Sequence, residues 1–107
     1  MSTGCASRKG GKMAVKIIIK RIVPEDNIKY LTALLKQLRT LANNQPGYIS
    51  GETLRNFENP NENLVISTWQ SIDDWKNWEN SKERSEIQEK IDLLLGEETK
   101  YEIYYYG

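Results

Sequence analysis

The sequence predicts an α+β sandwich with the element order β-α-β-β-α-α-β. Three features indicate it: a segment rich in β-branched residues, an amphipathic helix after it, and a polar turn between two further strand-like segments. With 107 residues the chain fits a single domain. We expect residues 1–13, rich in Ser, Gly and Lys, to form a disordered tail, and residues 14–107 to form that domain.

The first strand and helix are predicted from residue type and spacing. Residues 15–23 are mostly β-branched and apolar, which is typical of a strand. Pro24 ends this strand, and the acidic pair after it suits the first turn of a helix. We expect the helix to run to about Asn43 with Arg39 on its solvent side. Its apolar stripe, at helical spacing, consists of Ile28, Leu31, Leu34, Leu35, Leu38, Leu41 and Ala42.

Turn-forming residues frame a predicted hairpin. Pro46 and Gly47 end the helix, because proline disfavours helix in the residue before it and glycine tolerates positive φ. Strands are expected at residues 48–57 and 63–70. The polar turn at residues 58–62 separates them, so they form a hairpin.

Two shorter helices and a last strand complete the domain. Ser71 and Asp74 resemble a capping box with a shorter acid, and Ser81 is placed to cap the next helix. Gly96 ends that helix, and residues 99–106, rich in Tyr and Ile, form the last strand. The resulting order is the ferredoxin-like arrangement with its second helix broken in two.

Both faces of the predicted sheet are apolar. Residues 17–19 of the first strand are all isoleucine, and residues 64–66 of the third are Leu, Val and Ile. Helices cover one face, yet strands with two apolar faces must be covered on both. At about 25 cal/mol per Å², leaving one face wet would forgo many kcal/mol. We therefore expect a homodimer through the open sheet face, which forms a dimeric α+β barrel.

Charge, hydropathy and cysteine usage narrow the partners. Fifteen basic residues balance fifteen acidic ones, which leaves no overall field to attract nucleic acid. The longest apolar run, residues 17–19, is far shorter than the roughly 20 residues of a membrane helix. Cys5 is the only cysteine, so no intrachain disulfide forms. We expect a cytoplasmic protein that binds neither nucleic acid nor membrane.

The chain contains no histidine, which excludes several kinds of chemistry at once. Ser-His-Asp and Cys-His nucleophiles and histidine metal sites are ruled out. The carboxylate pairs at residues 73–74 and 97–98 complement helix ends, and no acidic set has the spacing of a calcium or magnesium loop. No glycine-rich loop joins a strand to a helix for a dinucleotide. We expect no metal and no other tightly bound cofactor.

Three tryptophans within ten residues are the remaining candidates for a site. Trp75 and Trp78 share a helix face, and Trp69 ends the third strand just before that helix, so the three can converge. An aromatic stripe at helical spacing usually fills a core, so packing stands beside substrate binding for Trp75 and Trp78. For Trp69 both interpretations stay open, since an indole N–H near a sheet edge can also orient a bound ring.

Four polar residues near the tryptophans are further candidates for the pocket. They are Tyr48, Arg55, Asn63 and Arg84. Ligand pockets combine apolar walls with a few polar groups, which these side chains could supply. The strong alternative for each of them is an exposed strand or helix residue without a role in the pocket.

The order of these motifs resembles the antibiotic biosynthesis monooxygenase (ABM) family. The motifs are the Pro-Gly-Tyr turn at residues 46–48, the strand at residues 64–69 that ends in Trp69, and the tryptophans at residues 75 and 78. The resemblance spans residues 15–105. It implies a ferredoxin-like homodimer whose pocket lies between sheet and helices, with Trp69 in the place of the family's tryptophan at the end of the third strand.

The resemblance also implies a function. Several family members oxygenate phenolic or hydroquinone substrates without metal or flavin. It points to a cofactor-independent monooxygenase acting on an aromatic or quinol-like small molecule, with Trp69 as the catalytic candidate. The alternative is a non-catalytic dimeric module with a small-ligand-binding, structural or regulatory role. Haem-degrading relatives need an asparagine in the first strand and a histidine on a later helix, but Lys20 and Arg21 occupy that strand here and histidine is absent.

Overall fold

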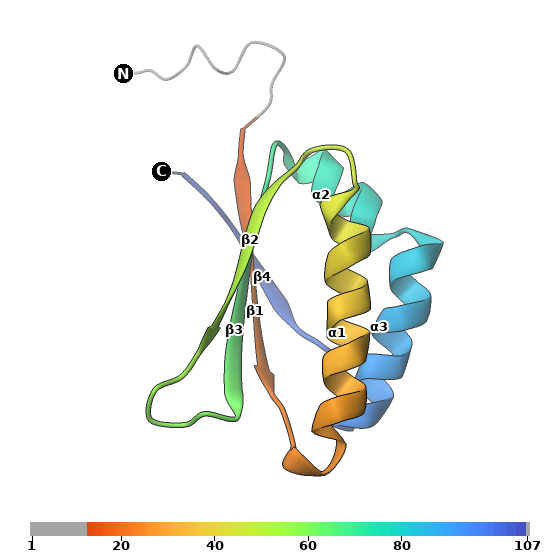
Figure 1. The fold of residues 1–107 in the computed structure, drawn as a ribbon. Helices are drawn as coiled ribbons and strands as arrows, with labels where there is room; N and C mark the ends of the chain where they lie inside the picture. The colour runs from red at the N-terminus through yellow and green to blue at the C-terminus, as the bar shows by residue number, and fades with distance from the viewer. Residues whose placement is uncertain (1–12, 107) are drawn as a thin grey trace.

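The computed structural model describes residues 13–106. Four antiparallel strands form one sheet in the order β2-β3-β1-β4, and the helices lie on one of its faces (Figure 1). The strands are β1 (Val15–Ile22), β2 (Tyr48–Arg55), β3 (Glu62–Trp69) and β4 (Tyr101–Tyr105). The helices are α1 (Ile28–Asn43), α2 (Ile72–Glu79) and α3 (Lys82–Leu95), with a 3₁₀ turn at Glu25–Asn27 before α1. The predicted α+β ferredoxin-like arrangement is confirmed, including its broken second helix.

Residues 1–12, which hold most of the predicted tail and Cys5, lie outside the described residues. The boundary between tail and domain therefore stays a prediction. Within residues 13–106, no helix is both long enough and apolar enough to span a bilayer.

Two strands are shorter than predicted, because side chains near their ends bind the backbone. The Asn56 carboxamide oxygen accepts hydrogen bonds from the backbone N–H groups of Glu58 (2.9 Å) and Asn59 (3.1 Å), so the hairpin turn begins at residue 56. At the last strand, Asp92 on α3 accepts hydrogen bonds from the Thr99 backbone N–H (3.2 Å) and hydroxyl (2.6 Å). Thr99 is thereby held at the helix, and pairing begins at Tyr101.

The predicted helix caps are present. The Ser71 hydroxyl accepts a hydrogen bond from the Asp74 backbone N–H (3.2 Å) and donates one to the Asp74 carboxylate (2.9 Å). Ser81 accepts from the Arg84 backbone N–H (3.2 Å), and Gly96 ends α3 with a positive φ of 74°. Such caps satisfy backbone groups that have no partner within the helix.

Gly47 joins the turn before β2 to the start of α2. Its φ is +83°, and a Cβ atom there would overlap the Asp74 side chain, which is held by the Ser71 cap. The Gly47 carbonyl accepts a hydrogen bond of 2.7 Å from the Gln70 backbone N–H. Only glycine meets both demands, so two segments distant in sequence are tied together at one end of the sheet.

The buried side chains form two clusters. The sheet cluster lies between the sheet and α2 and consists of Val15, Ile17, Ile19, Trp69, Trp75 and Trp78. The helix cluster packs α1 against α3 and consists of Val23, Leu31, Leu34, Ile87 and Ile91. Only part of the predicted α1 stripe is fully buried. Leu31 and Leu34 are buried, but Ile28, the first residue of the helix, is 42% exposed.

The face of the sheet opposite the helices, here called the open face, carries the other set of apolar strand residues. Ile17 and Ile19 are buried beneath the helices, so Ile18 between them points the other way. Ile18 pairs with Ile66, and both are half-buried in the single chain. The predicted apolar character of both faces is thus confirmed, while the partner expected on the open face stays a prediction.

Candidate functional site

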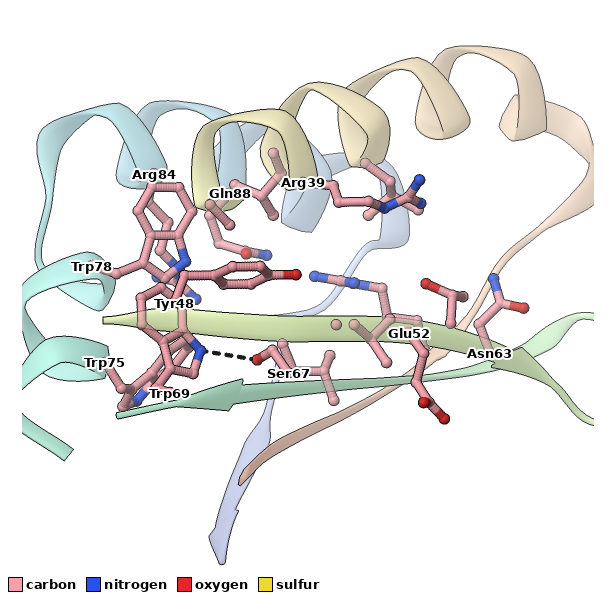
Figure 2. Close-up of a pocket in the computed structure, with 18 residues that line it drawn as sticks. Arg39, Tyr48, Glu52, Asn63, Ser67, Trp69, Trp75, Trp78, Arg84 and Gln88 are labelled. Carbon is pink, nitrogen blue, oxygen red and sulfur yellow. Dashed lines mark hydrogen bonds between the residues drawn. The ribbon is translucent and has the colours of Figure 1, made fainter. Parts of the chain in front are cut away.

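A cavity of about 300 Å³ lies between the inner face of the sheet and the helices (Figure 2). Its walls come from β1, β2 and β3 on one side and from α1, α2 and α3 on the other. The tryptophans stand at one end, and Asn63 lies at the opposite end (Figure 2). This size is at the lower limit of ordinary small-molecule sites, which measure about 300–1,000 Å³.

Trp69 is the centre of an aromatic group at one end of the cavity. Its ring lies 5.3 Å from Tyr48 in an edge-to-face arrangement, 5.9 Å from Trp75 and 6.5 Å from Trp78, measured between centroids. The Trp69 indole N–H donates to the Ser67 hydroxyl at 3.1 Å, and the residue is 1% exposed. Trp69 therefore packs in the sheet cluster and lines the cavity, so both sequence interpretations of it describe one position.

Trp75 and Trp78 project from the same side of α2, as their spacing predicts, and both line the cavity. Trp75 also contacts Tyr101 of β4 edge to face at 5.3 Å. The guanidinium of Arg84 lies 5.5 Å from the Trp75 ring centre, which is a cation–π contact. The helix break between α2 and α3 thus brings a cation against the aromatic end.

Tyr48 reaches into the cavity because of two irregular positions in β2. The pairing of β2 with β3 shifts register between Tyr48 and Ser50. At Gly51 a Cβ atom would overlap the Tyr48 hydroxyl, so glycine lets the ring lie along the strand, as Figure 2 shows. Burial raises the pKa of the Tyr48 hydroxyl, while the charge of Arg39 acts in the opposite direction. The group therefore stays a neutral hydrogen-bond donor at neutral pH.

Arg21 places a buried cation on the cavity wall. It is 5% exposed and follows Val15, Ile17 and Ile19 on the inner face of β1, where it pairs with Asn63 of β3. Its Nε and Nη2 atoms are buried and have no hydrogen-bond partner among residues 13–106. Burial lowers the pKa of Arg21 to about 10, with Asp92 acting against the shift and Arg84 adding to it. The side chain is still charged at neutral pH.

Two more arginines line the cavity. Arg84 is 8% exposed and its Nη1 donates to the Glu79 carbonyl at 3.2 Å; burial lowers its pKa, opposed by Glu79 and Asp92. Arg39 lies between α1 and the strands (Figure 2). Glu52 belongs to the same wall, but its carboxylate lies on the side of the strands away from the helices (Figure 2). The interior of the cavity therefore favours negative charge.

Most of the residues proposed from the sequence meet at this cavity. The structure brings together Tyr48, Asn63, Trp69, Trp75, Trp78 and Arg84. Arg55 is not among the lining residues. It is exposed at the last position of β2 and borders a shallow groove on the open face.

Sequence reasoning missed several cavity residues. Arg39 is exposed, as its assignment to the solvent side of α1 predicted, but it also lines the cavity one helical turn after Leu35. The sequence did contain an indication that Arg21 points inward, because Arg21 alternates with the apolar residues 15, 17 and 19. Ser67 and Gln88 carried no distinctive pattern. Within residues 13–106, no group of three or more Cys, Asp or Glu side chains is arranged to hold a metal ion.

The sequence profile of the antibiotic biosynthesis monooxygenase family matches residues 13–90. These residues include α1, α2, most of α3 and the aromatic end of the cavity. This chain belongs to the antibiotic biosynthesis monooxygenase family. Comparison with the curated proteins found no match.

Solved structures of other proteins share the fold at low sequence identity. A conserved protein from Methanosarcina mazei Go1 superposes with a TM-score of 0.81 at 21% identity, over 89% of this chain and 94% of that chain. A conserved protein from Bacteroides thetaiotaomicron VPI-5482 gives 0.77 at 18% identity, over 88% and 98%. SnoaB, a cofactor-independent oxygenase from Streptomyces nogalater, gives 0.72 at 14% identity, over 89% and 92%. These similarities show that the ABM-family fold extends over nearly the whole chain.

Proposed function

We propose that this chain is a cofactor-independent monooxygenase that oxidises an aromatic or quinol-like small molecule in the cavity. The observation that carries the proposal is that aromatic side chains, Tyr48 and Trp69, line the same cavity as the cations Arg21 and Arg84, which favour negative charge. Family membership and the fold shared with SnoaB support the same chemistry. In this site Trp69 and Tyr48 contact the substrate ring, and the arginines contact its oxygens.

The proposed reaction needs only substrate and dioxygen. A phenolate transfers one electron to dioxygen, and the resulting radical and superoxide combine at a ring carbon that bears hydrogen. The carbon–oxygen bond formed in this way gives a hydroperoxide after protonation. Loss of that hydrogen and cleavage of the oxygen–oxygen bond then release water and leave a quinone. The ring loses four electrons and dioxygen gains four, so no other reductant enters.

The arginines take the place of a general base in this scheme. A cation near a phenol favours the ionised form and lowers the pKa of the phenol. Arg21 and Arg84 are both buried, so their charges are only weakly screened by water. They also stabilise the superoxide formed in the electron transfer, in the manner of preorganised charge stabilisation. The phenol proton passes to solvent, and Tyr48 remains a neutral donor to the substrate oxygen.

A second copy of this chain is the partner that suits the open face. Ile18, Leu64 and Ile66 are half-buried there, and Leu54 is 46% exposed. Apolar surface of this kind is stabilised by pairing with the same surface of another protomer. The homodimer would close two sheets into one barrel and leave the cavities on its outside, under the helices. A sedimentation mass near that of one chain at micromolar concentration would defeat this proposal.

Oxygen consumption tests the oxidation directly. We would measure dioxygen uptake and quinone absorbance with naphthol and a panel of hydroquinones. Wild type is expected to consume one dioxygen per quinone formed. Trp69→Phe and Tyr48→Phe are expected to be slower, while Tyr30→Phe, at an exposed tyrosine of α1, serves as the matched control. No uptake above buffer across the panel would favour the non-catalytic ligand-binding module instead.

A further inference from the structure

Arg21 is a buried cation without a counter-ion in contact. Among the described residues the ion pairs within 4.0 Å are Lys20–Glu62 and Lys76–Glu79, and neither involves Arg21. Asp92 is the carboxylate that acts on Arg21 through its charge, but its Oδ1 atom already accepts hydrogen bonds from Gln88 and Thr99. A buried charge normally requires a partner, and removing one partner of such a pair is strongly unfavourable.

The two unpartnered atoms of Arg21 lie on one edge of its guanidinium. Nε and Nη2 each carry an N–H group, and along that edge the two N–H groups point in parallel. This fork matches the two oxygens of a carboxylate, a pairing that is short, charge-assisted and specific in geometry. Arg21 lines the cavity, so a ligand bound there lies beside this side chain.

The cavity also has aromatic rings at one end and buried cations along its wall. The tryptophans stand at one end, whereas Arg21 pairs on the sheet with Asn63, which marks the other end in Figure 2. Gln88 adds a buried amide oxygen without a partner, which suits a hydroxyl group on the ligand. A neutral hydrocarbon would leave all of these polar atoms unsatisfied.

We propose that the cavity binds an aromatic acid, with its rings against Trp69 and Tyr48 and its carboxylate paired with Arg21. This inference rests on the cavity being the ligand site of the proposed function, but it does not require any oxidation there. It narrows the substrate class from aromatic or quinol-like molecules to those that also carry a carboxylate. Arg21 is then a specificity-determining residue, because its buried charge selects the acid.

Equilibrium binding of two isosteric probes tests this inference. Naphthoate and naphthamide have nearly the same shape and differ in charge, and their binding can be followed by quenching of the cavity tryptophans. Wild type should bind naphthoate about ten-fold or more tightly than naphthamide, as expected for a charge-assisted pair. Because the pair is buried, added salt should reduce this preference only slightly. Equal affinity for both probes, or no binding of naphthoate, would overturn the proposal without any variant.

Variants then locate the charge that is responsible. Arg21→Met should bind both probes alike, and Arg21→Lys should retain a reduced preference, because lysine keeps the charge but lacks the fork. Lys36→Met removes one positive charge from the exposed side of α1 and should keep the full preference. A full preference in Arg21→Met would also overturn the proposal. A preference for naphthoate without oxygen uptake would support this inference and contradict the proposed oxygenase activity. Oxygen uptake without a preference for naphthoate would support the oxygenase activity and contradict this inference.

Discussion

The helix cluster packs between α1 and α3, and the same two helices contribute to the wall of the cavity. The two regions differ in the side chains that they bury. The helix cluster contains only aliphatic side chains, and Leu31 and Ile91 in it have no exposed surface. The cavity wall holds the polar atoms that packing leaves unsatisfied. Among the described residues, every buried side-chain nitrogen or oxygen without a partner belongs to Arg21, Trp75 or Gln88, and all three line the cavity.

This contrast separates residues kept for stability from residues kept for function. Native proteins satisfy nearly all buried polar groups, so unsatisfied ones gathered in one place require an explanation. Sites that break local rules of packing are usually functional. The helix cluster stabilises the fold around the cavity, and the cavity holds charge at a cost to stability.

Truncation in the helix cluster should give the largest effect. Ile91→Ala removes a fully buried side chain between α1 and α3 and should lower the free energy of unfolding by about 2–5 kcal/mol. Leu93→Ala, at a position 76% exposed on the same helix, should change it by less than about 0.5 kcal/mol. Urea denaturation measures both. Equal effects would show that the helix cluster is not the stabilising core.

Removing the buried charge of Arg21 should increase the stability of the fold, which is opposite to the effect of truncation in the helix cluster. Arg21→Met keeps a long apolar side chain and eliminates the unpaired cation, so the free energy of unfolding should rise by about 1–3 kcal/mol. Arg39→Met, at an exposed position of the same cavity, should leave it within about 0.5 kcal/mol. A loss of stability in Arg21→Met would contradict the assignment of Arg21 as an uncompensated charge.

The same charge predicts a pH dependence. Burial lowers the pKa of Arg21 in the folded state to about 10, below its ordinary value, so the charged form opposes folding at neutral pH. This opposition is relieved as pH rises through about 10, because the folded state then loses its proton before the unfolded state does. The stability gap between Arg21→Met and wild type should therefore narrow between about pH 9 and about pH 11. A gap that widens over this range would count against burial as the cause.

The cap at the start of α3 should contribute a smaller amount. Ser81→Ala removes the hydroxyl that accepts the Arg84 backbone N–H and should cost about 1 kcal/mol of stability. Ser85→Ala, one turn further along and exposed, is the control and should cost much less. Because Arg84 sits in the first turn of α3, the loss of the cap should also weaken naphthoate binding. Thermal denaturation and probe binding together test this.

The smallest expected change concerns Tyr48. Burial raises the pKa of its hydroxyl, so Tyr48→Phe should remove a phenol that ionises later than exposed tyrosines in an ultraviolet titration. If Tyr48→Phe removed a phenol that ionises in the ordinary tyrosine range, Tyr48 would not be shielded within the cavity.

The fold could be predicted from the sequence because the residues that indicate its helices, strands and turns act on their near neighbours in the chain. The helix ends are set by residues that act within one turn of their own positions, namely Ser71, Ser81 and Gly96. The turn before β2 requires glycine at position 47, because φ is positive there. The aromatic end of the cavity followed in the same way from the spacing of Trp75 and Trp78.

The arginines of the cavity were harder to predict, because their places depend on how the strands and helices pack around it. Arg21 alternates with the apolar residues of β1, which indicates the inner face, but whether that face meets a cavity or a packed core depends on the tertiary structure. The same dependence explains why Arg55 was grouped with the pocket residues. It ends β2 in an exposed position, where its neighbours in sequence say nothing about the cavity.

Thermal denaturation of wild type and Arg21→Met, each with and without naphthoate, tests the central claim most directly. A ligand that binds the folded state raises the melting temperature. We predict that naphthoate raises that of wild type, and that Arg21→Met starts higher and gains little from naphthoate. If naphthoate raised both melting temperatures equally, the charge of Arg21 would play no part in the site and the account would be wrong.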